Sequence, residues 1–302
     1  MAAGIQSGRG RDLHAHIVRV VRFAAEAGAD GAHLGASTLL GEVGAAAAAL
    51  LAAGLSVPAI TAPLAERAPR AGGRLPHLAA LYADERTAAV ELAMQTIAAG
   101  AAVGAARVLL NMGAVSLPGA RADLGRYFAR RELGEGEAGQ ALLDGAVAAR
   151  KAVGPRLLDA CRWSLERLAR DAEGRGATLL LHPGATPWDV PTPREALALV
   201  DAFRGAPLAL AFDPGRLSAL RALGLPLSDE GARALAAAAG AVVENDAVGL
   251  AAGFLPGLGE RDETLPRVAE LGASAPVIVI SAGDVTSAEV AAAVEQVRAR
   301  YG

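Results

Sequence analysis

Residues 177–190 have the sequence ATLLLHPGATPWDV, in which a short apolar run ends abruptly at His182 and is followed by proline and glycine. The run has the length of a buried strand, and its consecutive leucines leave neither face polar. Proline confines the residue before it to extended backbone and cannot continue the hydrogen-bond ladder of a central strand. The stretch therefore predicts a buried strand that delivers one polar side chain, His182, at its carboxyl end.

Two later stretches repeat this form at intervals of about thirty residues. Residues 207–217, PLALAFDPGRL, end their apolar run at Asp213, and residues 239–249, AGAVVENDAVG, end theirs at the Glu-Asn-Asp of 244–246. Such intervals leave room for one helix between consecutive strands, which is the βαβ unit of a parallel sheet. The carboxyl ends of parallel strands share one edge, so we expect these polar residues to meet there.

The rest of the chain alternates in the same way between apolar runs and alanine-rich helical stretches. Strands are predicted at about 3–7, 31–37, 56–62, 107–113, 177–183, 207–213, 241–247 and 276–282. Helices are predicted between them at about 12–27, 38–53, 86–102, 156–173, 192–204, 229–238, 263–271 and 285–300. Eight strands that are each followed by a helix predict the α/β class and a (β/α)8 TIM barrel. An open doubly wound sheet is the alternative, but no G-x-G-x-x-G loop follows the first strand, which argues against a dinucleotide fold.

A single barrel domain is expected over residues 1–302, because TIM barrels reach about 250 residues or more as one domain. The longest connection is an insertion at about 113–155, after the fourth strand, and it contains RADLGRYFARRELGEGEAG. A long insertion at the carboxyl face is often a lid over the site. A solvated excursion is the alternative, and the sequence favours neither.

Composition limits the classes of partner. The chain is 53% hydrophobic and 20% charged, which is typical of a globular protein with a large core. Its 29 Lys and Arg against 32 Asp and Glu give a net charge of −3, and no basic stripe indicates nucleic acid or an anionic membrane as partner. The single cysteine, Cys161, excludes an intramolecular disulfide. The first sixteen residues have no secretory signal pattern, so a cytoplasmic location is expected.

His182 and Asp213 are the predicted catalytic residues. Imidazole titrates near neutral pH, so His182 is suited to act as a general base or acid. Asp213 would orient His182 or bind ligand hydroxyl groups, although an aspartate at this point is also a good helix N-cap. Both roles are compatible, because helix N-termini after the strands face the same mouth.

The predicted substrate-binding residues follow other strands or the same ones: His33, Asn111, Trp188, Arg216, Asn245 and Asp246. Arg216 would hold an anionic group such as a carboxylate or a phosphate. Side chains alternate along a strand, so either Glu244 and Asp246 point inward or Asn245 does. We favour Asn245, with Asp246 in the loop. The alternatives are a hydrogen-bonded strand-end histidine for His33 and simple loop packing for Trp188.

Several stretches resemble the xylose isomerase-like TIM barrels, a family of sugar and sugar-phosphate isomerases and epimerases that also includes apurinic endonucleases. The resemblance covers nearly the whole chain and is carried by RFAAEAGADGAHLGAS (22–37), LLDACRWSLERLARDAEGRGATLLLHP (157–183), PREALALVDAF (193–203), LALAFDPGRL (208–217), LPGLGERDETLPRVAEL (255–271) and APVIVISAGD (275–284). It implies a divalent metal, Mn, Mg, Co or Zn, held at the ends of strands five to eight.

The family's metal ligands carry over poorly to this sequence. The glutamate of strand five falls on His182, and the aspartate of strand six is kept as Asp213, with Arg216 where the family has histidine. The histidine of strand seven falls on Val243, and the glutamate of strand eight falls near Ser281. A catalytic metal usually needs three protein ligands, and the positive charge of Arg216 would repel a cation. We therefore expect no metal ligands and no cofactor, with a bound Mn, Mg, Co or Zn as the open alternative. The chain would then be a divergent member with most ligands replaced.

Together these features predict a protein that acts on a small sugar, polyol or related hydroxy-carbonyl metabolite. If it is an enzyme, it would be an isomerase, epimerase or related lyase that transfers a proton beside a carbonyl group. The alternative is a non-catalytic barrel that serves as a binding protein or as the inactive partner of a related barrel subunit. A small-molecule ligand is expected in either case, and a homo-oligomer is an open alternative. An apurinic endonuclease is disfavoured, because that chemistry needs several zinc ions and five histidines do not supply their ligands.

Overall fold

Eight parallel strands form one sheet in the protein. The computed structural model describes residues 2–5, 13–36, 38, 40–64, 77–115, 136–249, 251–262, 264–267, 270, 275–281 and 285–301. The strands of the sheet are β1 (Ala2–Ile5), β2 (Gly31–Ala32), β3 (Ala59–Thr61), β4 (Arg107–Leu110), β6 (Thr178–Leu181), β8 (Leu208–Phe212), β9 (Ala239–Glu244) and β12 (Val277–Ser281). Each overlaps one of the eight predicted ranges, which confirms the strand prediction.

The sheet closes into a barrel. Each strand pairs with its neighbours in chain order, and β12 pairs with β1, so the two ends of the hydrogen-bonded ladder are β2 and β3. Parallel bridges from Gly31 to Ser56 and from Leu34 to Ile60 join these two ends. A Cβ on Gly31 would lie 2.3 Å from the carbonyl oxygen of Ser56, so this close approach needs glycine. The closed order confirms the barrel and excludes the open doubly wound sheet.

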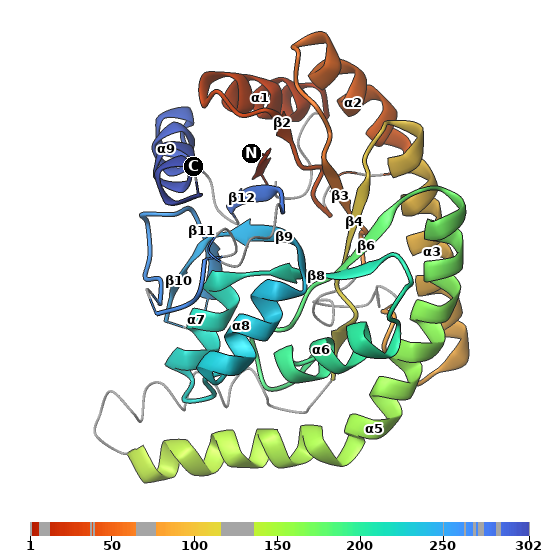
Figure 1. The fold of residues 1–302 in the computed structure, drawn as a ribbon, viewed down its shortest axis with the longest axis vertical. Coiled ribbons are helices and arrows are strands. Elements are labelled where there is room, and N and C mark those ends of the chain that lie inside the picture. Colours follow the sequence, from red (N-terminus) through yellow and green to blue (C-terminus); the bar gives the residue numbers. More distant parts are fainter. Residues whose placement is uncertain are drawn as a thin grey trace.

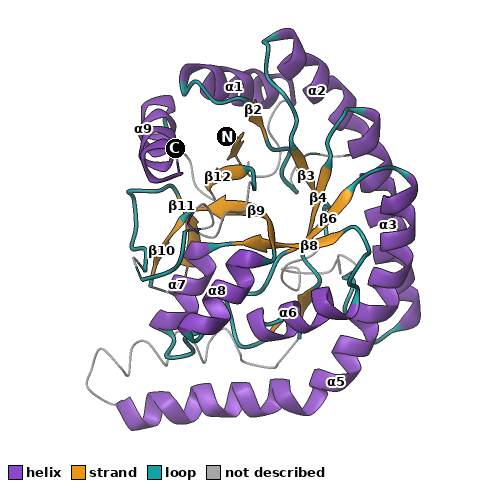
Figure 2. Cartoon of the chain, viewed as in Figure 1, coloured by secondary structure: helices purple, strands orange, loops and turns teal. Residues whose placement is uncertain are grey.

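Helices surround the barrel, as Figure 1 and Figure 2 show. They are α1 (Leu13–Glu26), α2 (Val43–Ala52), α3 (Ala83–Ala102), α5 (Gly136–Gly174), α6 (Pro193–Ala202), α7 (Pro214–Ala222), α8 (Asp229–Ala237) and α9 (Ser287–Tyr301), with a short 3-10 turn, η1 (Leu40–Glu42), before α2. Thr192 caps α6 in a full capping box with Glu195, and Pro193 occupies its first turn. Within the described residues, no helix combines the length and the apolar composition that crossing a bilayer would require.

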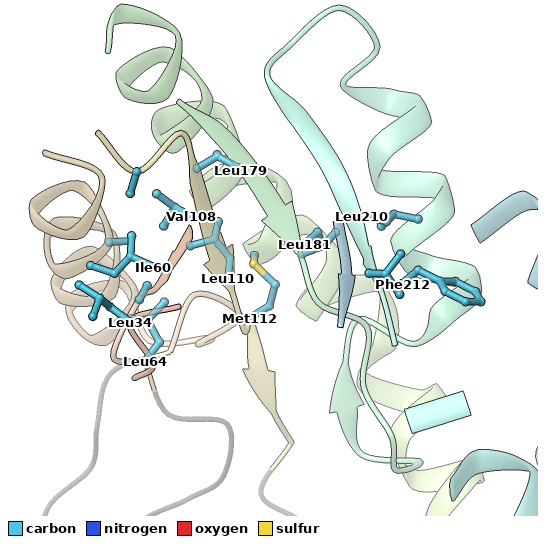
Figure 3. Close-up of a cluster of buried hydrophobic side chains, with 14 of the residues drawn as sticks. Leu34, Ile60, Leu64, Val108, Leu110, Met112, Leu179, Leu181, Leu210 and Phe212 are labelled. Carbon is cyan, nitrogen blue, oxygen red and sulfur yellow. The ribbon is translucent and has the colours of Figure 1, made fainter. Parts of the chain in front are cut away.

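Alternation along the strands decides which residues face the barrel interior. A small cluster fills the interior: Ala59, Leu109, Leu180, Ala211, Ala241, Val243 and Ile278. The residues on either side of these pack outward against the helices, and Figure 3 shows this outer core, which includes Val108, Leu110, Leu179 and Leu181. Because side chains repeat every two residues, the next inward positions fall at or just past the carboxyl ends of the strands. These positions are Thr61, Asn111, His182, Asp213 and Asn245.

Three parts of the fold differ from the sequence prediction. Helix α5 begins at Gly136, twenty residues before the predicted start, because Pro155 lies inside it rather than at its boundary. In Figure 1 the first part of α5 runs along the lower edge of the molecule and the remainder rises beside α3. Helix α7 directly follows β8 where no helix is predicted. A hairpin of β10 (Asp246–Val248) and β11 (Ala251–Phe254) follows β9.

Two predicted elements fall partly outside the described residues. Of the insertion at about 113–155, residues 113–115 contain the short strand β5 (Gly113–Ala114), which pairs with β7 (Asp189–Val190), and residues 136–155 form the start of α5. Its middle, 116–135, lies outside the described residues. The helix predicted at about 263–271 includes four residues that the structure does not describe, namely 263, 268, 269 and 271, and the described residues 264–267 are not helical.

Candidate functional site

A cavity of about 110 Å³ opens at the carboxyl ends of the barrel strands. One water needs only about 10–15 Å³ of such space, so the cavity can take several waters or a small ligand. Its polar lining comes from residues that are far apart in the sequence: His33, Thr61, Asn111, His182, Asp189, Asp213, Arg216 and Asn245. The structure thus brings together six of the eight residues predicted for the site, at the face where barrels of this fold class place their chemistry.

His182 and Asp213 form a buried pair at the centre of this lining. His182 Nε2 and Asp213 Oδ2 are 2.8 Å apart, and both side chains are at most 3% exposed. The two residues directly follow the neighbouring strands β6 and β8, and each is the next inward position after an interior residue of its strand. An imidazole that donates Nε2–H to a carboxylate carries its lone pair on Nδ1, so this pairing defines the tautomer of a neutral His182.

The other carboxylate oxygen of Asp213 is fixed by two donors. Asn245 donates from Nδ2, and the backbone N–H of Arg216 donates as part of the α7 N-cap, both to Oδ1 at 2.8 Å. Asp213 is therefore a helix cap and a site residue at once. Burial works against its charge, but the hydrogen bond from His182 and the charges of His182 and Arg216 hold the pKa of Asp213 below its usual range. Asp213 is thus a carboxylate at neutral pH.

The guanidinium of Arg216 is engaged by the protein. Its Nη1 donates to the carbonyl oxygen of Pro183 at 2.9 Å, and its Nε lies 3.6 Å from Asp213 Oδ2. The side chain is 17% exposed, and it lines the cavity. Arg216 therefore holds the loop after β6 next to the start of α7, and its charge is partly balanced by Asp213.

His33 lies across the cavity and is bound to Thr61. His33 Nε2 and Thr61 Oγ1 are 2.8 Å apart and both residues are buried. Burial, with a smaller contribution from the charge of His182, lowers the pKa of His33 to about 4. His33 is therefore an uncharged group at neutral pH.

Asn111 presents the cavity with a buried amide that the described residues do not satisfy. It is 4% exposed and lines the cavity, yet its Oδ1 has no hydrogen-bond partner among the described residues. Buried polar atoms in native proteins almost always have a partner, so such an atom in a cavity points to a bound donor. The opposite part of the lining is apolar and consists of Val243, Ile278 and Ile280.

Two predicted substrate-binding residues, Trp188 and Asp246, lie outside the cavity lining. Trp188 is 7% exposed in the loop after β6. The carboxylate of Asp246 accepts hydrogen bonds from the backbone N–H groups of Gly257 and Gly259, so it shapes the loop after the hairpin. Glu244 points outward, where it binds Arg261, Arg300 and Tyr301. The inward residue of this run is Asn245, which is the orientation favoured from the sequence.

Several lining residues are absent from the sequence prediction. Asp189, the first residue of the short strand β7, accepts hydrogen bonds from the backbone N–H groups of Ala185 and Thr186 at 2.9 Å and also lines the cavity. Ala252 and Gly253 reach the cavity from the hairpin. None of these follows a strand of the sheet directly, so the strand-end pattern gives no signal for them.

Comparison with solved structures shows what this architecture is similar to. A D-allulose 3-epimerase from Methylomonas sp. in complex with D-allulose matches with a TM-score of 0.68 at 13% identity, over 100% of this chain and 96% of the other. A 3-keto-D-glucoside 4-epimerase from E. coli matches with a TM-score of 0.64 at 16% identity, over 99% of both chains. A D-tagatose 3-epimerase-like protein gives 0.67 at 15%, over 100% and 97%. This chain shares the barrel fold of these sugar epimerases. No model of a known protein family matches the sequence, and a search of curated proteins found no match to it.

The residues of this barrel do not fit the divalent metal that the sequence resemblance implies. Within the described part of the chain, no group of three or more His, Cys, Asp or Glu side chains could hold a metal ion. His182 is hydrogen-bonded to Asp213, and the position implied for a histidine ligand is the apolar Val243. Ile280 lines the cavity at the end of β12, and the side chain of Ser281 lies outside the described residues. Fewer than three ligands is too few for a typical catalytic site.

Proposed function

We propose that the protein binds a small sugar, polyol or related hydroxy-carbonyl compound in this cavity and transfers a proton beside its carbonyl group. It would thus act as a sugar isomerase or epimerase, or as a related lyase. The observation that carries the proposal is the buried pair of His182 Nε2 and Asp213 Oδ2, 2.8 Å apart in the cavity wall. Support comes from the fold, which is shared with an epimerase that binds D-allulose.

In the proposed reaction His182 is the proton carrier. Held by Asp213 through Nε2–H, the imidazole takes the proton from the carbon beside the carbonyl group and returns it to a neighbouring atom. The Asp213 carboxylate holds the imidazole in this tautomer and stabilises the imidazolium that forms. Asn245 and the backbone of Arg216 keep Asp213 in place through Oδ1.

The reaction that we propose uses no divalent metal, because the donor set does not fit one. The polarised carbonyl oxygen would instead lie among the polar groups of the lining, which include Asn111 and the His33–Thr61 pair. Trp188 and Asp246 stand outside the lining, so the proposal gives them no contact with the ligand. We propose the cytoplasm as the compartment of the protein. The single cysteine is buried and unpaired, which fits a reducing environment where disulfides are rare.

A non-catalytic role is the second candidate, and the apolar wall of the cavity favours it. Val243, Ile278 and Ile280 occupy the sector where the resemblance implies a histidine and a glutamate ligand. A barrel that has lost these groups would serve as a binding protein or as the inactive partner of a related barrel subunit. The two candidates differ in whether the purified chain alone turns over a sugar.

Turnover of a ketohexose panel tests the proposal. The purified chain is incubated with D-allulose, D-tagatose and D-fructose, and the products are separated by chromatography. We expect isomerised or epimerised product with the wild type and a loss of at least about 100-fold in His182→Gln and Asp213→Asn, the range of general acid–base catalysis. Binding without turnover would favour the non-catalytic barrel, and neither binding nor turnover would contradict both candidates.

A further inference from the structure

The charge of the cavity bears on the chemistry of its ligand. Among the described residues that line the cavity, Arg216 is the only arginine or lysine, whereas Asp189 and Asp213 are both acidic. Arg216 is bound to the carbonyl oxygen of Pro183 and lies beside Asp213. The described part of the lining therefore offers no excess of positive charge to an anionic ligand.

The two histidines of the cavity do not give the described lining an excess of positive charge. His33 has a pKa of about 4 through burial, so it is neutral at physiological pH. His182 lies 2.8 Å from the Asp213 carboxylate, so a proton on its imidazole is balanced by that carboxylate. Among the described lining residues, a phosphate dianion would face two aspartates and one guanidinium, that of Arg216, which the protein already engages.

Asn111 offers the ligand a hydrogen-bond acceptor. Its buried Oδ1 is an acceptor with no hydrogen-bond partner among the described residues. A hydroxyl group can donate to such an oxygen, but a fully ionised phosphate or carboxylate has only acceptors. The apolar wall of Val243, Ile278 and Ile280 suits the C–H face of a sugar ring or chain.

We propose that the cavity selects an uncharged, hydroxyl-bearing ligand over its phosphorylated counterpart, and that Asn111 accepts a hydrogen bond from one ligand hydroxyl. This inference rests on the proposed function and narrows its substrate class. It differs from the sequence-based expectation that Arg216 holds an anionic group, because the structure engages that guanidinium within the protein.

The test compares paired ligands by isothermal titration calorimetry at pH 7.5 with the full chain. The probes are D-allulose, D-fructose and D-tagatose, the 6-phosphates of the same sugars, and inorganic phosphate. We expect the free sugar of at least one pair to bind at least tenfold more tightly than its phosphate, and inorganic phosphate not to compete with it. A 6-phosphate that binds as tightly as the free sugar or more tightly would overturn the inference and leave the proposed function standing. Absence of binding by every sugar would overturn both.

A variant pair tests the role of Asn111. Asn111→Leu removes the amide, and we expect this variant to bind the free sugar at least tenfold more weakly than the wild type. Thr186→Val is the matched control, because Thr186 Oγ1 is also buried without a partner among the described residues but does not line the cavity. We expect the affinity of Thr186→Val for the free sugar to stay within twofold of the wild-type value. Asn111→Asp keeps an acceptor oxygen, and its binding decides the case if Asn111→Leu does not fold. Wild-type affinity for the free sugar in Asn111→Leu would overturn the role of Asn111 as an acceptor. If only Asn111→Asp folds, a tenfold loss of affinity in that variant would overturn it as well.

Discussion

Asn245 donates from Nδ2 to Asp213 Oδ1 at 2.8 Å, while its own Oδ1 accepts the backbone N–H of Gly253 at 2.8 Å. Nδ2 also donates to the carbonyl oxygen of Val243 at 3.0 Å. One buried amide thus connects the end of β9, the β10–β11 hairpin and the carboxylate that orients His182. Asn245 is better described as a positioning residue than as a group that binds ligand.

Removal of this amide should loosen the site and the fold together. In Asn245→Ala, the Gly253 N–H and the Val243 carbonyl oxygen lose their partner, and Asp213 keeps only one donor on Oδ1. We expect the free energy of unfolding to fall by about 2–4 kcal/mol, since each buried polar group left unsatisfied costs about 1–3 kcal/mol. Urea unfolding measures this change. A fall of less than about 0.5 kcal/mol would show that the amide does not hold these elements together.

Gly215 should tolerate no side chain, because α7 packs closely against Asn245. A Cβ on Gly215 would lie 2.0 Å from Asn245 Oδ1. Gly215→Ala should therefore lower the melting temperature and the ligand affinity. Gly145, inside α5, serves as the control, because a Cβ added there would have nothing within 4 Å. Gly145→Ala should stabilise the protein by about 0.5–1 kcal/mol. Equal effects of the two substitutions would contradict the close packing at Gly215.

Acidification should destabilise the protein through His33. The unfolded chain protonates His33 below about pH 6.5, whereas the folded protein resists protonation down to about pH 4. The contribution of His33 to stability is thus complete above pH 6.5 and is lost as the pH falls toward 4, by about 3 kcal/mol at most. Asp213 contributes to the pH dependence in another range. Because its pKa is lowered in the folded protein, its contribution to stability is lost only as the pH falls below 3.8, the usual pKa of an aspartate.

Urea unfolding at pH 7 and pH 4.5 tests this dependence. The wild type should lose more stability between the two pH values than His33→Gln, which has no group to protonate at this position. Parallel losses in the two proteins would assign the pH dependence to other groups.

Substitution of Glu244 should lower the free energy of unfolding and leave the affinity for the ligand unchanged. Its carboxylate is fully buried and accepts hydrogen bonds from Arg261 at 2.5 and 2.6 Å, from Arg300 at 3.1 Å and from the hydroxyl of Tyr301. Glu244→Gln breaks a buried ion pair, which costs about 3–5 kcal/mol. Glu173→Gln, on the exposed end of α5, should change stability by less than about 0.5 kcal/mol. Altered sugar affinity in a folded Glu244→Gln would place Glu244 in the site after all.

The sequence predicts the barrel well because its signal is local. Each strand is an apolar run that ends at a polar residue or a proline, and each run forms a strand in the structure. The inward alternation also predicts most of the site, since Asn111, His182 and Asp213 follow interior residues by two positions. Helix α7 escapes prediction because Pro214 and Gly215 open it, and that dipeptide is typical of a turn.

Other features depend on contacts between distant segments. The hairpin of β10 and β11 is rich in alanine and glycine, so it lacks the β-branched alternation of a strand. The engagement of Arg216 by Pro183 joins residues 33 positions apart. Asn111 Oδ1 has no partner among the described residues because of what surrounds it in the fold. These tertiary relationships, rather than any motif, distinguish an uncharged ligand from an anionic one.

Exchange of substrate hydrogen with solvent tests the central claim most directly. The chelator-treated chain is incubated in D2O with D-allulose, D-tagatose or D-fructose, and deuterium at the carbon beside the carbonyl group is followed by NMR. We predict incorporation that survives chelation and falls at least about 100-fold in His182→Gln and Asp213→Asn. Absence of exchange in the wild type, loss of exchange on chelation, or unchanged exchange in His182→Gln would contradict metal-free proton transfer by the His182–Asp213 pair.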